Sequence, residues 1–324
     1  MADLMDYVNG DATTVWGKKR VADGHPSPYR LKYIELGNEQ FNNDSLTAQF
    51  AAMADVIWRK DATVQVVFCV SDDTHEDFAG DLQNFKKTIE HARKNGRQAW
   101  FDVHIFNDNE KEPDLKDFEF AEKQLHTIEP DSTFRLCIFE ENANNARMRR
   151  ALAHANAINR VMRLKYDIPI LCAANALQVD HQNDNGWDQG LLFFNQQNVR
   201  GQPSYYVSQM TAENYLPLVI KTDFISKADS LDITSRMSAD GKSITIQVVN
   251  NKPTAVSTTL ILAGQKAHPG KLRVTELKAV SLDDWNPADE PFRIVPVTKE
   301  VKISGNSYIY TFAPYSFTVL RFDE

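Results

Sequence analysis

Two acidic tracts in this chain have residue types that could carry out acid/base chemistry. Gly37-Asn38-Glu39 follows the β-prone run LKYIEL, and Glu140-Glu141-Asn142 follows the β-prone run FRLCIF. The carboxyl ends of buried parallel strands are where α/β enzymes place working groups. Two facing glutamates, one protonated and one ionised, are what the cleavage of a glycosidic bond needs. This chemistry requires that the strands before the two tracts lie in one parallel sheet.

The first part of the chain alternates between short apolar runs and amphipathic segments. The runs typical of buried parallel strands cover residues 31–36, 64–70, 100–106, 134–139 and 168–173. Helical spacing of apolar residues between them predicts helices over about 46–60 (with Ser45 as N-cap), 81–94, 113–128 and 146–166. The Gly- and Pro-rich segment before the first strand is expected to be a connection. About five βα units in this order predict an α/β fold with a partial (β/α)8 TIM barrel.

The pattern changes after about residue 220. Short alternating runs such as 244–250 and 258–263 are broken by Gly, Asn and Pro, which is typical of an antiparallel β-sandwich. The predicted domains are therefore residues 1–220, a partial barrel with the catalytic region, and residues 221–324, a sandwich domain.

Polar residues follow each of the five predicted strands. They are Asn38 and Glu39, Ser71 and Asp72, His104, Glu140 and Glu141, and Asn175 and Gln178. In a β/α barrel the carboxyl ends of the strands converge on one mouth, where these side chains would meet.

Several of these segments together resemble a known family. KYIELGNE, the segments DLMDYVNG and WGKKRVADGHPSPY before it, and CIFEENAN after it are similar to the arabinofuranosidases of glycoside hydrolase family 51. The resemblance covers essentially the whole chain, although within the sandwich it is carried mainly by APYSFTVLRF. It implies a (β/α)8 barrel followed by a β-sandwich and a retaining hydrolysis of arabinofuranosides from plant polysaccharides, without a cofactor.

The resemblance also implies roles for single residues. Glu39 matches the general acid/base, and Asn38 matches a neighbouring amide that holds a sugar hydroxyl. An acidic residue before the nucleophile favours Glu141 over Glu140 as the nucleophile, and Glu140 stays an alternative. His104 matches a histidine of the site, whereas the tyrosine often found two residues later is Phe106 here. Gln178 resembles a sugar-contacting glutamine.

Each assignment has a structural alternative. Glu35 lies within a predicted strand and is expected to be an ion-pair partner rather than an acid. His104 could be a buried histidine that bonds the backbone. Trp187, in the polar loop at 179–190, is interpreted as a platform for a sugar ring, with a lid that packs on the core as the alternative.

Composition excludes several other functions. The net charge of −8 lacks the basic excess that binds nucleic acid, and no apolar run is long enough for a membrane span. The three cysteines lack CxxC spacing and the eight histidines form no metal motif, so neither a metal nor a cofactor is expected. The residues at the start of the chain show no signal peptide, but the compartment stays open because a longer enzyme could be secreted or periplasmic.

The strand count leaves the functional prediction with two forms. The strand before Glu39 corresponds to the fourth barrel strand of the family, so strands one to three have no counterpart here. We therefore expect the C-terminal portion of a longer enzyme that needs an N-terminal half, or a homo-oligomer that covers the open sheet. The alternative function is a non-catalytic carbohydrate-binding or structural fragment that needs a partner.

Overall fold

The computed structural model describes residues 1–70, 75–109, 115–131, 133–164, 168–182, 187–223, 231–263, 270–303 and 305–323. Ser71 and Asp72, expected at the end of the second strand, lie outside these residues. The chain divides into two compact units. The first comprises Met1–His104, Leu115–Phe139 and Ile168–Ile170, and the second comprises Ile105–Asp114, Glu140–Asp167 and Leu171–Glu324.

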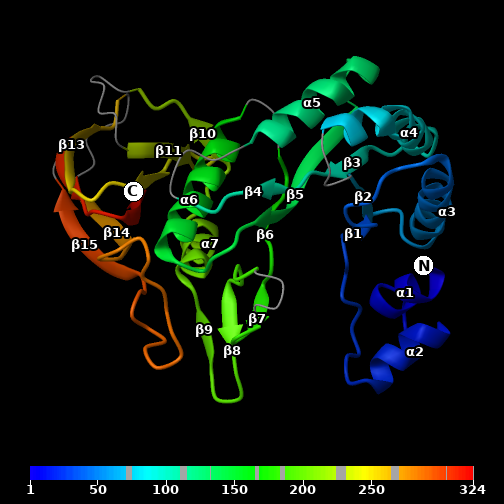
Figure 1. Ribbon diagram of the computed structural model, residues 1–324, viewed down its shortest axis with the longest axis horizontal. Helices are drawn as coiled ribbons and strands as arrows, with labels where there is room; N and C mark the ends of the chain where they lie inside the picture. Colours follow the sequence, from blue (N-terminus) through cyan, green and yellow to red (C-terminus); the bar gives the residue numbers. More distant parts are fainter. Residues whose placement is uncertain are drawn as a thin grey trace. The chain divides into compact units, whose positions relative to one another are not determined.

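A parallel sheet forms the centre of the first unit (Figure 1). Its strands pair in the order β1-β2-β3-β5, and all three pairings are parallel. The strands are β1 (Tyr33–Leu36), β2 (Gln65–Cys69), β3 (Ala99–Asp102) and the part of β5 (Phe134–Asn142) that precedes Glu140. The predicted parallel arrangement of these strands is confirmed.

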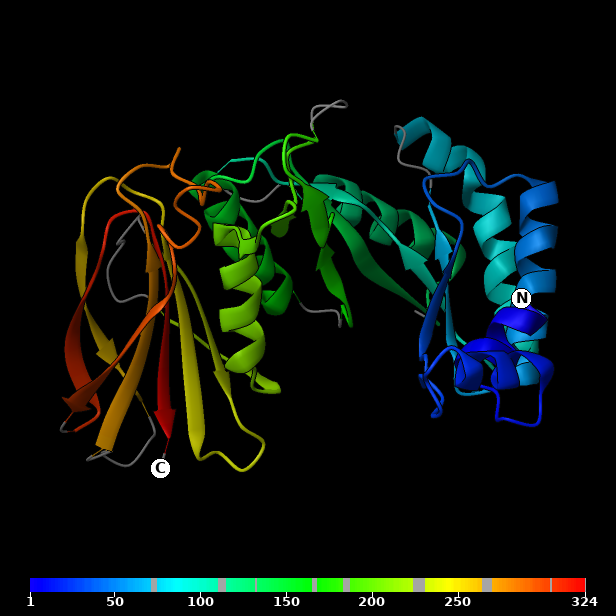
Figure 2. The same ribbon diagram turned by 90° about the horizontal axis from the view of Figure 1, so that it is seen from below.

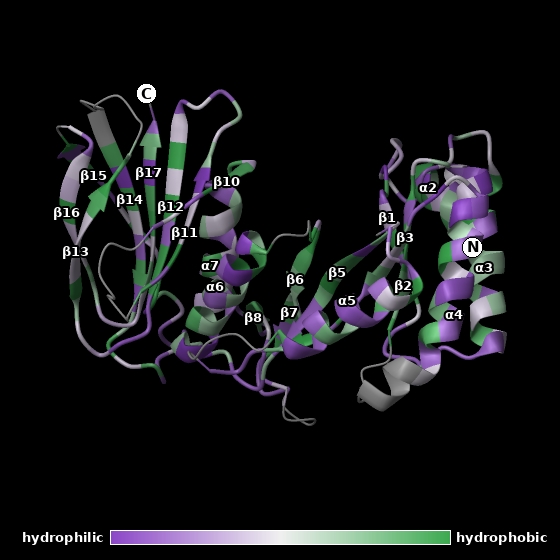
Figure 3. Cartoon of the chain, turned by 90° about the horizontal axis from the view of Figure 1, so that it is seen from above, coloured by the Kyte–Doolittle hydropathy of each residue, from purple (hydrophilic) through white to green (hydrophobic). Residues whose placement is uncertain are grey.

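Helices cover one face of this sheet. They are α3 (Asp44–Lys60), α4 (His75–Lys94) and α5 (Lys116–Ile128), whereas α1 (Ala2–Val8) packs on α3 and on α2 (Val15–Ala22). Phe68 of β2 and Phe101 of β3 are register partners. The ring of Phe50 in α3 lies 6.1 Å from that of Phe68, and the ring of Phe85 in α4 lies 5.3 Å from that of Phe101. Figure 3 shows both hydrophobic and hydrophilic segments on α3 and α4, as expected for helices with one face on a sheet.

The structure differs from the sequence prediction near the start of the chain. Helix α2 occupies part of the predicted connection, because the Thr14 side chain caps it by accepting from the Gly17 N–H at 2.9 Å. The buried Arg20 then donates to the carbonyls of Tyr7 at 2.8 Å and Gly10 at 2.7 Å, which joins α2 to α1. The N-cap of α3 is Asn43 rather than Ser45, with its side chain accepting from the Leu46 N–H at 3.0 Å.

Two predicted strand boundaries also change. The run at 100–106 forms two strands, β3 and β4 (Ile105–Phe106), with His104 between them. Strand β5 continues beyond the predicted end through Glu140, Glu141 and Asn142, because β4 pairs with its last residues.

The second unit is dominated by antiparallel sheets (Figure 2). Six strands pair in the order β10-β11-β12-β17-β14-β15, and β13 pairs with β16. These strands are β10 (Leu218–Ile220), β11 (Leu231–Met237), β12 (Ser243–Asn250), β13 (Val256–Ile261), β14 (Gly270–Lys278), β15 (Val297–Ile303), β16 (Ser307–Phe312) and β17 (Ser316–Asp323). One apolar cluster, which includes Val248, Leu260 and Phe312, fills the space between the two sheets.

A second apolar cluster joins helices to the sandwich. It contains Leu152 of α6 (Met148–Arg163), Val207 of α7 (Pro203–Glu213) and Phe317 of β17. The boundary at residues 220/221 stays a prediction: β10, just before it, pairs with β11 of the sandwich, and this packing also groups α6 and α7 with the sandwich. The remaining strands of the unit are β6 (Leu171–Ala173), β7 (Leu177–Val179), β8 (Leu192–Phe194) and β9 (Val199–Gly201). No helix among the described residues has the length and apolar character needed to cross a membrane.

The turn after β1 gives a testable prediction about the packing around Gly37, two residues before Glu39. Gly37 has a φ of +88°, and a Cβ there would lie 2.4 Å from the Cys69 Sγ and 2.8 Å from Phe50. Gly96 is a matched control, because its φ is +65° and nothing lies within 4 Å of an added Cβ. We expect Gly96→Ala to lower the free energy of unfolding by about 1 kcal/mol, and Gly37→Ala by at least about 2–3 kcal/mol, since only the latter adds a clash to the backbone strain. Urea unfolding measures both, and equal losses would show that Gly37 is not packed as described.

Candidate active site

Glu39 lies in an unusual backbone conformation just after the edge strand β1. The strand ends at Leu36, and Asn38 and Glu39 are both exposed. Glu39 has a φ of +49°, which few residues other than glycine adopt. The loop that follows is attached to α4, since the Asn42 N–H donates to Asp81 Oδ2 at 2.9 Å and its carbonyl accepts from Asn84 Nδ2 at 2.6 Å. These bonds support a backbone conformation that is otherwise unfavourable at Glu39.

His104 connects Glu39 to a buried carboxylate. Its Nδ1 lies 2.6 Å from Glu39 Oε1 and its Nε2 lies 2.8 Å from Asp102 Oδ2. The other oxygen of Asp102 accepts from the Phe139 N–H at 2.6 Å. His104 was predicted to contact substrate or to be a satisfied core histidine, and the structure gives it two carboxylate partners. Sequence reasoning missed Asp102, although an Asp inside the apolar run WFDVHIF indicates a buried charge that requires a partner.

Glu141 belongs to a buried cluster in the second unit. Its Oε1 accepts from Arg150 Nη1 at 3.0 Å, and its Oε2 bonds His154 Nδ1. Arg150 also donates to the Glu141 carbonyl at 2.8 Å, and His154 Nε2 lies 2.8 Å from Ser208 Oγ. The three side chains of this Glu141–Arg150–His154 cluster are at most 1% exposed. Burial raises the pKa of Glu141, but the charges and hydrogen bonds of Arg150 and His154 outweigh it and lower that pKa to about 2.

Glu140 has a different environment. It is half-buried, and its Oε2 accepts a long hydrogen bond of 3.3 Å from Asn142 Nδ2. Glu140 and Asn142 alternate with Glu141 along β5, so they point away from the helix α6 that binds Glu141. Asn142 is the register partner of Phe106, so Phe106 shares this face.

Aromatic rings lie beside this face in the second unit. Phe106 is 43% exposed, and its ring centroid is 6.1 Å from that of Trp187 in an edge-to-face arrangement. Trp187 is half-buried. A partly exposed aromatic pair next to a carboxylate suits a sugar ring, whose C–H groups pack on aromatic faces while its hydroxyls bond polar groups.

Gln178, predicted to contact the sugar, lies instead inside its own loop. Its Nε2 donates to the carbonyls of Gln182 at 3.1 Å and Trp187 at 3.0 Å and to Asp188 at 2.9 Å. Its Oε1 accepts from the Gly190 N–H at 2.7 Å, and the residue is 3% exposed. In this conformation Gln178 holds the backbone around Trp187. It would influence substrate binding by positioning that loop.

One group in the first unit has the composition of a metal site. Oxygens of Glu35 and Asp102 and a nitrogen of His104 lie within 4.8 Å of one another. Both ring nitrogens of His104 already bond carboxylates, so no lone pair is available unless a proton is lost. The geometry fits a hydrogen-bonded cluster better than a metal centre.

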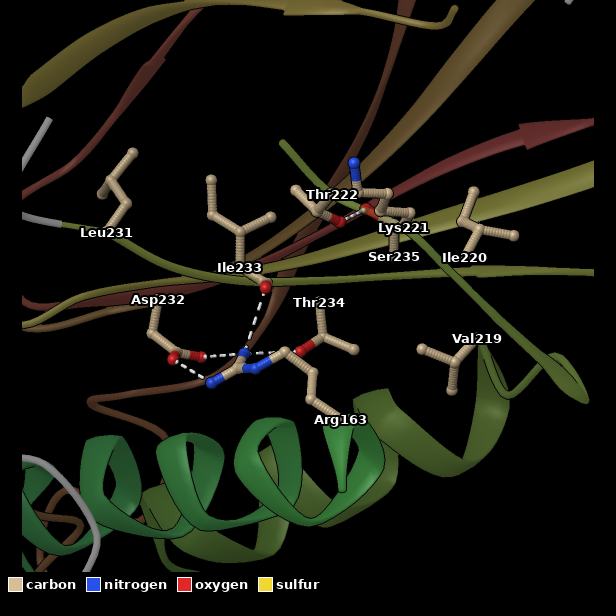
Figure 4. Close-up of a pocket in the computed structure, with 10 residues that line it drawn as sticks. All are labelled: Arg163, Val219, Ile220, Lys221, Thr222, Leu231, Asp232, Ile233, Thr234 and Ser235. Carbon is tan, nitrogen blue, oxygen red and sulfur yellow. Dashed lines mark hydrogen bonds and ion pairs between the residues drawn. The ribbon is translucent and has the colours of Figure 1, made fainter. Parts of the chain in front are cut away.

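A pocket of about 410 Å³ lies elsewhere in the second unit, between the end of α6 and strands β10 and β11 (Figure 4). None of the predicted site residues lines it. The Arg163 guanidinium at its floor bonds Asp232 through two nitrogens and donates to Thr234 at 2.7 Å. These bonds connect α6 to β11, so we interpret the pocket as structural.

Two family models match this chain, and both describe arabinofuranosidase domains. The model of the Alpha-L-arabinofuranosidase 1 domain matches residues 1–124, and that of the Alpha-L-arabinofuranosidase C-terminal domain matches residues 137–316. Alpha-L-arabinofuranosidase 2 of Arabidopsis thaliana is 23% identical over 98% of this chain and 44% of its own length. A probable alpha-L-arabinofuranosidase A of Aspergillus oryzae is 24% identical over 98% of this chain and 47% of its own length. The chain thus spans about half the length of these relatives.

Solved structures support the fold. The alpha-L-arabinofuranosidase of Thermotoga maritima, in complex with arabinose, superposes with a TM-score of 0.73 at 15% identity, over 100% of this chain and 72% of that one. The family 51 enzyme of Thermotoga petrophila gives a TM-score of 0.76 at 15% identity, over 99% and 72%. The predicted partial TIM barrel followed by a β-sandwich is confirmed, and the chain belongs to the alpha-L-arabinofuranosidase family.

Proposed function

We propose that this chain carries the acid/base and the nucleophile of a retaining α-L-arabinofuranosidase that removes arabinofuranosyl residues from plant polysaccharides. The observation that supports it most directly is the exposed Glu39 at the carboxyl end of a parallel strand, bonded by the buried pair of His104 and Asp102. Family membership gives this geometry its reaction class. Arabinose-containing oligosaccharides or polysaccharides are the proposed substrates.

The proposed reaction uses two carboxyl groups. Glu39 protonates the glycosidic oxygen while an ionised glutamate attacks the anomeric carbon and forms a glycosyl ester. Glu39 then takes a proton from water, which attacks the same carbon, releases the glutamate and yields arabinose with its configuration retained. A mechanism that retains the anomeric configuration requires the two carboxyl groups to lie about 5 Å apart during the reaction.

The choice between the two adjacent glutamates follows from their surroundings. The resemblance favours Glu141, but both oxygens of Glu141 bond α6 residues and the side chain is 0% exposed. A nucleophile must reach the anomeric carbon, which a carboxylate on the helix-facing side of its strand does not do. We therefore propose Glu140 as the nucleophile, with Glu141 as the residue that fixes the strand. Asn38, Phe106 and Trp187 would bind the sugar.

The chain presents a surface that suits a further polypeptide. Strand β1 is the edge of the described sheet, and large apolar side chains are exposed around it and on the two N-terminal helices. They include Leu4, Val15, Trp16, Tyr29, Tyr33 and Phe41. An N-terminal half of a longer enzyme or a second copy of this chain would bury them, and the proposed turnover depends on that cover.

Azide rescue separates the two candidate nucleophiles. We expect Glu39→Ala and Glu140→Ala each to lower kcat on 4-nitrophenyl α-L-arabinofuranoside by about 10³-fold or more, because each removes a group that acts in the transition state. Azide should restore Glu140→Ala with formation of the β-arabinofuranosyl azide, and Glu39→Ala with formation of the α-azide, since the two replace groups on opposite faces of the sugar.

Glu141→Ala is the matched comparison. If azide rescues it with the inverted product and Glu140→Ala keeps its activity, the nucleophile is Glu141 as the resemblance implies. Binding of arabino-oligosaccharides in calorimetry without turnover, by an assembly that includes the polypeptide covering β1, would favour the non-catalytic alternative.

The buried cluster gives a prediction about acid stability. The folded-state pKa of Glu141, about 2, lies below the value of about 4.3 expected for an unfolded Glu. Its contribution is therefore present above about pH 5 and is lost as the pH falls toward 2, and the shift corresponds to on the order of 3 kcal/mol. Glu141→Gln should be less stable than wild type at pH 7 and should lose less stability between pH 5 and pH 2.5 in urea unfolding. Glu140→Gln is the control, and a similar change in both variants would contradict the assignment.

The aromatic pair predicts a binding effect. Trp187→Ala should raise KM for an arabinofuranoside about 3- to 10-fold with little change in kcat, because an aromatic contact contributes about 0.5–1.5 kcal/mol. Phe292→Ala removes a 69% exposed aromatic side chain elsewhere in the second unit and should leave KM unchanged in steady-state kinetics of the same assembly. Equal KM values for Trp187→Ala and wild type would exclude the platform role.

A further inference from the structure

The contacts of His104 restrict where protons can lie between three side chains. One oxygen of the buried Asp102 accepts from the Phe139 N–H at 2.6 Å, and the other lies 2.8 Å from His104 Nε2. Because a carboxylate can only accept, we assign the proton of this second contact to His104 Nε2. With Nε2–H facing Asp102, Nδ1 faces Glu39 Oε1 at 2.6 Å, and that contact needs a proton of its own.

His104 also separates like charges. Glu35 and Asp102 both have oxygens within 4.8 Å of a His104 ring nitrogen, and Glu39 Oε1 lies 2.6 Å from the Nδ1 of the same ring. Three carboxylates gathered without a donor would repel one another, so the ring is what allows Glu39 to hold one orientation. The side chain of Asp102 is 0% exposed, that of His104 7% and that of Glu39 32%. Exposure therefore rises from Asp102 through His104 to Glu39, which is the member of the three that solvent reaches.

We propose that Asp102 and His104 are positioning residues for the acid/base: they fix Oε1 of Glu39 so that Oε2 exchanges the proton with the glycosidic oxygen. This inference rests on the proposed function. The Oε2 proton passes to the glycosidic oxygen as its bond to the anomeric carbon breaks. The same Oε2 later takes a proton from the attacking water, while the Nδ1–Oε1 hydrogen bond persists through both steps. Asp102 touches no substrate and acts only through His104.

The dependence of rate on the leaving group tests this role. Dinitrophenolate leaves without protonation, whereas a sugar alkoxide requires it, so loss of acid catalysis harms only the second kind of substrate. For Asp102→Asn we expect kcat/KM on an arabinofuranosyl disaccharide to fall about 10²-fold or more, and kcat/KM on 2,4-dinitrophenyl α-L-arabinofuranoside to fall less than about 3-fold. A general structural defect would lower both by similar factors.

Asp55 provides a matched control. Its Oδ1 lies 2.8 Å from the Nε2 of His91, so Asp55→Asn removes a carboxylate–histidine contact from the same unit without touching Glu39. The ratio of the two kcat/KM values should stay at the wild-type value in this variant. Equal losses on both substrates in Asp102→Asn, or a changed ratio in Asp55→Asn, would overturn the proposal.

Two further measurements keep the test decisive if Asp102→Asn folds poorly. His104→Asn places an amide near the position of Nδ1 and should retain more disaccharide activity than His104→Ala. In proton NMR, wild type should show a low-field, slowly exchanging imidazole N–H that Asp102→Asn and His104→Asn both lack. Absence of that resonance in wild type overturns the positioning role whatever the activity. Its presence in an assembly that includes the polypeptide covering β1, and that hydrolyses neither substrate, refutes the proposed function and leaves the contact established.

Discussion

The two hydrogen bonds of the Asp102 carboxylate are the interactions on which the site of the first unit depends. This carboxylate is buried, and a buried carboxylate is tolerated only when its oxygens accept good hydrogen bonds. One oxygen bonds the Phe139 N–H and so joins β3 to β5, and the other orients the His104 ring. The same side chain thus supports the pairing of β3 with β5 and, through His104, the orientation of Glu39. A shift of β5 relative to β3 would disturb the sheet and the candidate acid/base together.

Strand β5 shows why sequence patterns did not assign the second carboxylate. Burial does not alternate along it: Leu136, Cys137 and Ile138 are buried in succession, Phe139 and Glu140 are half-buried, and Glu141 and Asn142 are buried. Counting in steps of two along an apolar run therefore does not tell which of the two glutamates is enclosed. The partners decide it, because Arg150 and His154 of α6 bond Glu141. These partners lie 9 and 13 residues further along the chain, so neither residue type nor spacing within the strand reveals them.

Much of the fold could be predicted because periodicity carries it. Apolar runs such as VQVVFCV became strands of a parallel sheet, and the alternating runs after residue 220 became antiparallel strands. The features that could not be predicted from the sequence are those that depend on partners the local pattern does not show. Helix α2 is stabilised by the bonds of Arg20 to carbonyls of the preceding segment, and Gln178 is enclosed by its own loop rather than open to substrate. Among the candidate residues, Glu39 was identified by its motif. Asp102 was identified only from the three-dimensional structure, because a single Asp in an apolar run does not reveal its partner.

The backbone at Glu39 carries strain that its surroundings must balance. A φ of +49° at a residue with a side chain costs on the order of 1 kcal/mol or more, and the neighbouring Gly37 has a φ of +88°. Such a turn lets Asn38 and Glu39 leave the strand in succession, so that both become exposed instead of alternating across the sheet. The bonds from Asn42 to Asp81 and Asn84, together with the bond from His104, hold this conformation. Because the strain falls on the candidate acid/base itself, a substitution that relaxed the turn would stabilise the fold while it moved Glu39 away from His104.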